Sequence, residues 1–269
     1  MSSIVTNINA AKAESAMMGA SQVVHNATAH LATGSRILSA ADDSAGLAIS
    51  TRMSSDMISL NRAMHNANDG VSMLQTADSA SGDIGNALVR MRQLALQAAN
   101  GTYTDQDRGA LSNEFSQLRE HISNTVEKTL WNDRSLLDGS MSSAQLQIGA
   151  TSNDAQTVDL ADFKGLQALS SSIGTAAEAK SALDAIDESL GTIDSKRVQW
   201  GAAMNRLVHA GDSSANINEN LSSSRSKILD TDYAKATAEL AKAQILQMAG
   251  KAMLSQANQA PISVLRLLR

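Results

Sequence analysis

A repeating spacing of apolar residues runs through most of the chain and predicts long helices. In the first 33 residues, the apolar positions follow one another at alternating steps of three and four residues, as in a helix seam with a seven-residue repeat. These positions are Ala10, Ala13, Met17, Ala20, Val24, Ala27 and Leu31. Only Lys12 and Glu14 carry charge in this segment. A helix with so little charge should be buried against partners on more than one side.

The longest such pattern lies between residues 53 and 98. Its positions are Met53, Met57, Leu60, Met64, Ala67, Val71, Leu74, Ala77, Ser81, Ile84, Leu88, Met91, Ala95 and Ala98. A continuous helix over this stretch would span roughly 70 Å. Asn100-Gly101 should end it, because both residues tolerate the left-handed conformation that often closes a helix. A second helix of about 104–129, with Phe115 and Ile122 on one face, should return antiparallel to the first.

Residues 131–175 have a different character. Turn signals and a short alternating run over residues 145–148 predict a small β-hairpin and loops that bury little apolar surface. Helical spacing returns after this segment, at Ala179, Leu183, Ile186, Leu190, Ile193, Arg197, Trp200, Met204 and Leu207, and more weakly as far as Ile228. Residues 231–260 again have few charges, and one apolar stripe there comprises Ala234, Ala238, Ala241, Ile245, Met248 and Ala252.

The pattern therefore predicts an all-α fold, an elongated antiparallel helical bundle or coiled coil with a small β-hairpin region in mid-chain. We expect four parts: terminal helices at 1–33 and 231–269, a connector at 34–46, long helices at 47–130 and 176–230, and the hairpin and loop region at 131–175. Asp42, Asp43 and Ser44 stand where they can cap the helix that follows the connector. The low-charge ends need each other, or other subunits, to cover their apolar faces.

Composition narrows the function classes. Aromatic residues make up only 2% of the chain against 43% hydrophobic residues, and Pro occurs once, so small residues can bring long helices close together. The net charge of −5 argues against a nucleic-acid partner. The absence of Cys excludes disulfides and a cysteine nucleophile. No run of about 18 apolar residues predicts a membrane span, and the first nine residues do not resemble a Sec-type signal peptide.

No constellation for catalysis or metal binding is apparent. The five His residues form no HExxH pair, and His25 and His30 are better explained as interface or satisfied side chains than as metal ligands. A phosphate-binding glycine loop is also missing. The Met stripe fits ordinary core packing better than a promiscuous partner groove, and the ends lack the basic face of membrane-active helices. We therefore expect no catalytic residue, metal, cofactor or membrane partner. An enzyme on a helical scaffold is the competing class, which the missing catalytic constellation disfavours.

Several blocks of the chain resemble bacterial flagellins. The segment from Leu31 to Ser50, which includes Thr-Gly-Ser-Arg-Ile-Leu-Ser-Ala-Ala-Asp-Asp, is similar to the flagellin connector. Two blocks resemble the first long helix and three resemble the C-terminal signature, namely 62–77, 89–100, 224–234, 243–261 and 264–269. Because these blocks occur in the correct order, chance is a poor explanation for the match.

The resemblance implies a non-enzymatic subunit of the extracellular flagellar filament, exported unfolded by the type III apparatus and added at the filament tip. The terminal helices would form an inner coiled coil around a channel, and the long helices a surrounding tube. Residues 131–175 would replace the large outer domains of longer flagellins. Implied partners are other flagellin subunits, an export chaperone, and cap and hook-junction proteins. The alternative is a flagellin-like hook–filament junction protein.

Three residue sets follow from the resemblance. The implied inner-core polymerisation set is Ala10, Met17, Val24, Leu31, Leu240, Ile245, Met248, Ala249 and Ala252. A set for neighbouring subunits, and for an animal Toll-like receptor, is Arg90, Arg92, Leu94, Gln97 and Glu114. A set for plant flagellin receptors is Thr33, Gly34, Arg36, Asp42 and Asp43. Filament contacts alone would also explain the second set, and Val89, Leu38 and Ala41 depart from polar or basic residues common in receptor-recognised members.

Overall fold

The computed structural model describes residues 6–267, and their side chains as far as residue 259. Residues 1–5 and 268–269, which belong to the predicted terminal helices, lie outside this description. The described residues form five α-helices: α1 (Ile8–Thr33), α2 (Ser44–Ala98), α3 (Asp105–Lys128), α4 (Ala176–Leu229) and α5 (Tyr233–Leu267). No helix in this described range is long and apolar enough to cross a membrane.

Four short strands and one 3₁₀ helix lie between α3 and α4. Strand β1 (Leu130–Trp131) pairs antiparallel with β2 (Arg134–Ser135), and β3 (Ser143–Gln147) pairs with β4 (Ala155–Asp159). In the second hairpin, Ser143 stands opposite Asp159. The 3₁₀ helix η1 (Gln167–Ser170) follows. The prediction of an all-α fold with a small hairpin region is confirmed.

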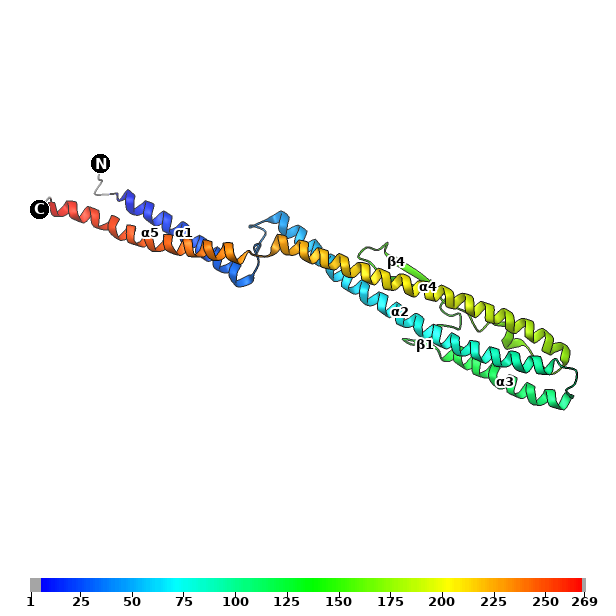
Figure 1. Ribbon diagram of the computed structural model, residues 1–269. Helices are drawn as coiled ribbons and strands as arrows, with labels where there is room; N and C mark the ends of the chain where they lie inside the picture. Colours follow the sequence, from blue (N-terminus) through cyan, green and yellow to red (C-terminus); the bar gives the residue numbers. More distant parts are fainter. Residues whose placement is uncertain (1–5, 268–269) are drawn as a thin grey trace. The chain divides into compact units, whose positions relative to one another are not determined.

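The chain divides into two compact units. The terminal unit comprises residues 1–55 and 220–269, and the long-helix unit comprises residues 56–219. Within the terminal unit, α1 and α5 lie side by side (Figure 1), and we call these two helices the terminal pair. Within the long-helix unit, α2, α3 and α4 run alongside one another with the short strands against them (Figure 1).

The predicted seam of α2 is the buried face of that helix. Of its positions, Leu60, Ala67, Leu74, Ala77, Ser81, Ile84, Leu88, Met91, Ala95 and Ala98 are buried, and the other four are half-buried. On α4, Ile186, Ile193, Trp200 and Leu207 are buried at the predicted spacing. A sustained period of three and four residues therefore identified the core-facing side of both long helices.

The segment 131–175 contributes far more to the core than its sequence indicated. Its buried apolar side chains are Leu136, Leu137, Met141, Val158, Leu160, Ala161, Phe163, Leu166, Ala168 and Ile173. The indole Nε1 of Trp200 on α4 donates to the backbone oxygen of Asp159 at 2.9 Å, and the Trp200 ring lies 6.2 Å from that of Phe163. The expectation that this segment buries little is wrong, because its irregular backbone inserts apolar side chains without any regular spacing.

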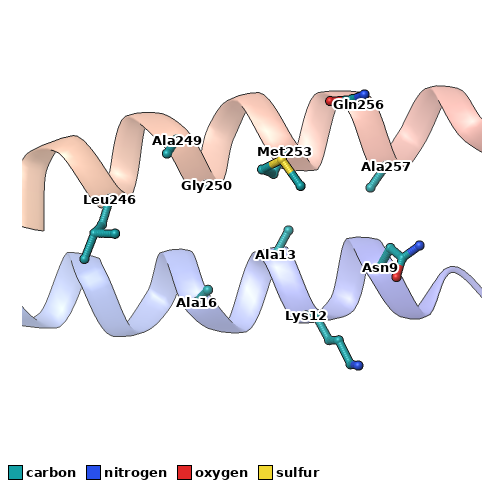
Figure 2. A pocket seen from close by; sticks show the side chains of 10 residues that line it. All are labelled: Asn9, Lys12, Ala13, Ala16, Leu246, Ala249, Gly250, Met253, Gln256 and Ala257. Carbon is teal, nitrogen blue, oxygen red and sulfur yellow. The ribbon is translucent and has the colours of Figure 1, made fainter.

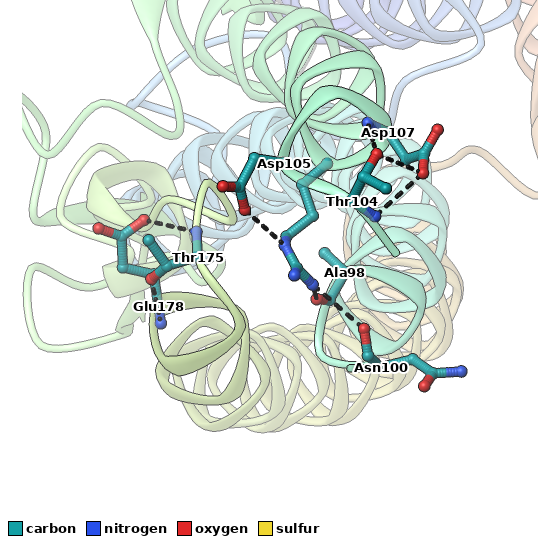
Figure 3. A network of polar contacts seen from close by, with 8 residues as sticks. Ala98, Asn100, Thr104, Asp105, Asp107, Thr175 and Glu178 are labelled. Carbon is teal, nitrogen blue, oxygen red and sulfur yellow. Dashed lines mark hydrogen bonds and ion pairs between the residues drawn. The ribbon is translucent and has the colours of Figure 1, made fainter. Parts of the chain in front are cut away.

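The end of α2 also differs from the prediction. Asn100 and Gly101 are not left-handed, since positive φ angles among the described residues occur only at Gly34, Gly139, Asn132 and Asp133. Instead, Nη1 of Arg108 on α3 donates to the backbone oxygens of Ala98 and Asn100, both at 3.1 Å (Figure 3). A cationic side chain thus satisfies the carbonyl groups at the end of α2, which a left-handed residue would otherwise do.

Candidate assembly surfaces

The two helices of the terminal pair meet along a seam of mostly small side chains. The α1 residues of this seam are those predicted from the sequence, and Ala20 and Ala27 are its buried members. On α5 the buried or half-buried positions are Ala236, Leu240, Ala243, Gln247, Gly250, Leu254 and Ala257. These positions also alternate at steps of three and four residues, so α1 and α5 pack as two seams of one coiled coil.

The small residues allow the two helices to approach closely. A Cβ atom added to Gly250 would lie 3.5 Å from Cβ of Met17. At the N-terminal end of α1, the side chain of Asn7 caps the helix by accepting from the backbone nitrogen of Ala10 at 3.0 Å. The same side chain donates through Nδ2 to the backbone oxygen of Ala257 at 2.8 Å. One residue therefore both starts α1 and fixes the register of α1 against α5.

The predicted apolar stripe of α5 faces away from this seam. Ile245 and Met248 are each 62% exposed, and Ala234, Ala238, Ala241 and Ala252 are exposed as well. The proposed inner-core set therefore divides into two parts. Ala10, Met17, Val24, Leu31 and Leu240 lie in the seam within one chain, whereas Ile245, Met248, Ala249 and Ala252 lie outside it. A surface of large apolar residues at this exposure is typical of an interaction site.

A groove follows the line where α1 and α5 meet. Its volume is about 680 Å³, and Ala13, Ala16, Leu246, Ala249 and Met253 are among its lining residues (Figure 2). In Figure 2, Leu246 reaches from α5 toward α1, and Ala13 and Ala16 lie on the α1 side of the groove. A second groove of about 340 Å³ shares Ala16 and Leu246 with the first. The two grooves are therefore adjacent along the terminal pair and are lined mainly by apolar residues, with Lys12, Glu239 and Lys242 among the lining side chains.

The connector between α1 and α2 is held by backbone hydrogen bonds to the chain between α4 and α5. Gly34 has φ +70° and donates to the oxygen of His30 at 2.9 Å, which closes α1 with the left-handed residue that favours glycine. The nitrogen of Arg36 donates to the oxygen of Leu229 at 2.7 Å, and the nitrogen of Thr231 donates to the oxygen of Gly34 at 2.9 Å. The connector is therefore a defined structure and not a flexible link.

The two Asp residues of the connector have different roles. Asp43 accepts from the nitrogen of Gly46 at 2.8 Å in the first turn of α2, as predicted for a helix start. Asp42 instead folds back and accepts from the nitrogens of Ser39 at 2.9 Å and Leu38 at 3.0 Å. These backbone donors, Ser39 first, lower the pKa of Asp42 below that of an ordinary aspartate. Of the other predicted plant-receptor positions, Thr33 and Arg36 are exposed and Gly34 is half-buried.

The second predicted set lies on the long-helix unit, and most of its charges are already paired. Nε of Arg90 donates to Oε1 of Glu114 on α3 at 2.8 Å. Nε of Arg92 donates to Oδ1 of Asp187 on α4 at 2.7 Å, and this guanidinium group lowers the pKa of Asp187. Gln97 is exposed. The two arginines thus link α2 to both of its neighbours while remaining about half accessible to a partner.

Leu94 does not belong to this surface. It is 1% exposed and lies in the core between Met91 and Ala98 on the buried face of α2. The resemblance placed it in one set with Arg90 and Gln97, which stand four and three positions away from it along α2. These three positions do not all lie on the exposed face of α2, because the buried stripe of this helix is wide enough to include Leu94. A partner cannot reach this side chain without opening the core.

Comparison with known proteins gives the family. The model of the bacterial flagellin N-terminal helical region matches residues 4–142, and that of the C-terminal helical region matches residues 183–268. A flagellin of Halalkalibacterium halodurans is 41% identical over 244 residues, which cover 89% of each chain. This chain belongs to the bacterial flagellin family. It is accordingly a structural subunit of the extracellular flagellar filament and not an enzyme.

Two further flagellins are similar to this chain. A flagellin of Listeria monocytogenes is 34% identical over 281 residues, covering 98% of each chain. The crystal structure of Bacillus cereus flagellin superposes with a TM-score of 0.53 at 33% identity, covering 56% of this chain and 88% of that one. These relatives are named as flagellins, so the hook–filament junction alternative is not favoured. Within the described residues no group of three or more His, Cys, Asp or Glu could hold a metal ion.

Proposed function

We propose that this flagellin polymerises mainly through the terminal pair, with the outer face of α5 and the groove along α1 and α5 receiving helices of neighbouring subunits. The observation that carries this proposal is the 62% exposure of Ile245 and Met248 and the 60% exposure of Met253 on one helix. Leaving side chains of this size in water costs about 1.5–3 kcal/mol each relative to full burial. Neighbouring subunits would recover that free energy at every position along the filament.

The shape of the groove supports a helix as the occupant. Its lining contains small residues on α1, such as Ala13 and Ala16, and larger apolar residues on α5, such as Leu246 and Met253. A ridge of side chains from another helix fits between such rows. In this proposal the terminal pairs of successive subunits form the inner coiled coil of the filament, and the long-helix units form the surrounding tube.

The same features support export in an unfolded state. The buried apolar residues of the terminal unit are almost all alanines, so a single terminal pair gains little free energy by folding alone. Ends of marginal stability can pass through a narrow export channel and become ordered at the filament tip. A chaperone would protect the exposed α5 face before export, and cap and hook-junction proteins would receive the same face afterwards.

We further propose that Arg90, Arg92, Gln97 and Glu114 contact neighbouring subunits. Their side chains lie on the surface of α2 and α3, and both arginines retain unused donors beside their ion pairs. An animal Toll-like receptor or, at the connector, a plant receptor would bind the same exposed groups on depolymerised subunits. Contacts between subunits alone are sufficient to explain the placement of the second set.

Substitution of one residue tests the assembly surface. Ala249→Asp puts a charge into the groove at a position that is exposed in the single chain, so the free subunit should fold normally. Desolvation of an unpaired charge costs several kcal/mol at each subunit contact. We expect electron microscopy and sedimentation to detect no long filaments from this variant. Ala249→Ser, which adds a small polar group without a charge at the same position, is the matched control and should form filaments. Filaments of normal length from Ala249→Asp would contradict the proposal.

A further inference from the structure

The turn between α2 and α3 contains the one Asn-Gly pair of the sequence, Asn100-Gly101. An asparagine side chain can be attacked at Cγ by the backbone nitrogen of the next residue, which closes a five-membered succinimide ring. The attack requires a nitrogen that is free and can lose its proton, an electrophilic side-chain carbonyl, and a following residue without steric hindrance. The structure of this turn meets each requirement.

The nucleophile is unobstructed. Among the described residues, no backbone hydrogen bond uses the nitrogen of Gly101. A Cβ atom added to Gly101 would meet nothing within 4 Å, and its φ is not positive. Both Asn100 and Gly101 are exposed, so water reaches the bond.

The electrophile is held and polarised. The backbone nitrogen of Thr102 donates to Oδ1 of Asn100 at 3.2 Å. This hydrogen bond keeps the side chain folded over the following peptide, as in an Asx turn. It also withdraws electron density from Cγ, the atom that Gly101 would attack.

The positively charged side chain of Arg108 contacts the peptide group that must lose its proton. Nη1 of Arg108 donates to the backbone oxygen of Asn100 at 3.1 Å (Figure 3). That oxygen and the nitrogen of Gly101 belong to the same peptide group, so the positive charge stabilises the anion formed when this nitrogen is deprotonated. The Arg108 side chain is only 12% exposed, which limits screening by solvent.

We propose that Asn100 is a site of spontaneous deamidation, at which the fold of the turn promotes succinimide formation. The bond from the Gly101 nitrogen to Cγ of Asn100 forms, the bond from Cγ to Nδ2 breaks, and Nδ2 leaves as ammonia with the Gly101 proton. One water molecule then opens the ring. Hydrolysis at Cγ gives Asp, and hydrolysis at the backbone carbonyl gives isoaspartate, which routes the main chain through Cγ.

Other asparagines lack this combination. Asn66, Asn68 and Asn86 lie inside α2, where the helical backbone holds the next nitrogen in a hydrogen bond. Asn132 and Asn153 lie in turns but precede Asp133 and Asp154, which carry a side chain where Gly101 has none, and the nitrogen of Asp154 already donates to the oxygen of Thr151 at 3.0 Å. Conversion should therefore be confined to the α2–α3 turn, and the isoaspartate form should lose the backbone geometry through which Arg108 caps α2.

The test is incubation of the purified full-length chain in mildly alkaline buffer made with heavy-oxygen water, followed by peptide mass spectrometry. We expect conversion at Asn100 to exceed that at all other asparagines combined, with heavy oxygen incorporated into both Asp and isoaspartate. Gly101→Ala, for which the space is open, should slow conversion about tenfold with unchanged circular dichroism. A short synthetic peptide of the same sequence is the reference for intrinsic reactivity.

Arg108→Met tests the activating cation, because Met fills similar space without a donor. We expect slower conversion at Asn100 than in the unmodified chain. Equal or faster conversion would overturn the role of the guanidinium group. An unchanged Asn100 in the folded chain under conditions that convert the peptide would overturn the site itself, as would earlier conversion at Asn132 or Asn153.

Discussion

Among the described residues, the buried apolar side chains of the terminal unit are Ile37 and four alanines, whereas those of the long-helix unit include Trp200, Phe115, Phe163 and many Leu and Ile residues. Burial free energy grows with the apolar area removed from water. The long-helix unit can therefore stabilise itself, but the terminal unit has little core of its own. Its larger side chains, such as Ile245 and Met248, are exposed in the single chain.

The two units also differ in how helix register is fixed. In the long-helix unit, ion pairs join α2 to its neighbours, including the pair of Arg197 with Asp78 at 2.8 Å. Exposed pairs of this kind contribute only about 0–1 kcal/mol each, but they disfavour a shifted register. Between α1 and α5 the described residues form no ion pair. Small residues and the Asn7 side chain align the terminal pair instead.

The largest effect should follow from removing either end. Without residues 1–30 or 235–269, one helix of the terminal pair loses its seam, and the apolar face of the other helix is stranded. At about 25 cal/mol per Å² this loss exceeds the few kcal/mol usually available. We expect no filaments by electron microscopy from either truncated protein. Long filaments from one of them would show that the terminal pair is not the principal assembly element.

The next effect concerns the long-helix unit alone. Trp200→Ala should lower the free energy of unfolding by about 3–5 kcal/mol, because it empties a fully buried site against Phe163. Urea unfolding of the monomer measures this loss. Val198→Ala, at a side chain that is 73% exposed, is the matched control and should be nearly neutral. Equal losses of unfolding free energy from the two variants would contradict the claim that the core around Trp200 stabilises the long-helix unit on its own.

Replacing residues 140–170 by a short Gly/Ser turn should also lower the free energy of unfolding. Val158, Leu160 and Phe163 leave the core in that variant, and the Trp200 indole loses its acceptor on Asp159. We expect a lower urea midpoint than for the unmodified chain. An unchanged midpoint would mean that this segment covers the core without stabilising it.

The smallest effect is a pH dependence at the start of α3. The side chain of Thr104 donates to Asp107 at 2.7 Å and its nitrogen at 3.0 Å, so the pKa of Asp107 lies below the ordinary value of 3.8. The contribution of this cap to stability is therefore present above the unfolded value and is lost as pH falls through the folded one. Thr104→Val should raise the pKa of Asp107 in an NMR titration. An unshifted midpoint would contradict this assignment.

The seam of α1 could be predicted fully because its sequence offers a single stripe. On α5, two apolar stripes have the same spacing. The prediction chose the outer stripe, which contains the larger residues Ile245 and Met248, whereas the seam contains Ala236, Ala243 and Gly250. The larger residues thus indicated the wrong face of α5, because close packing of two helices within one chain favours small residues. Spacing on α2 likewise could not separate buried Leu94 from its exposed neighbours without knowing how wide the buried stripe is.

The burial of side chains from residues 131–175 could not be predicted from the sequence for a different reason. No period marks a loop side chain such as Phe163 or Leu137 as buried, because its direction depends on tertiary contacts. The Arg108 cap on α2 is similar, since it joins residues eight and ten positions apart through a turn. Sequence patterns therefore reported the regular helices well and the irregular connections poorly.

Amide hydrogen exchange on monomer and filament tests the dependence of the terminal pair on neighbours most directly. In dilute monomer we expect fast exchange over residues 6–30 and 235–259 and strong protection over the buried stretches of α2, α3 and α4. In filaments both regions should be protected, because neighbouring subunits cover α5 and order the ends. Strong protection of residues 6–30 and 235–259 in the dilute monomer would contradict the account.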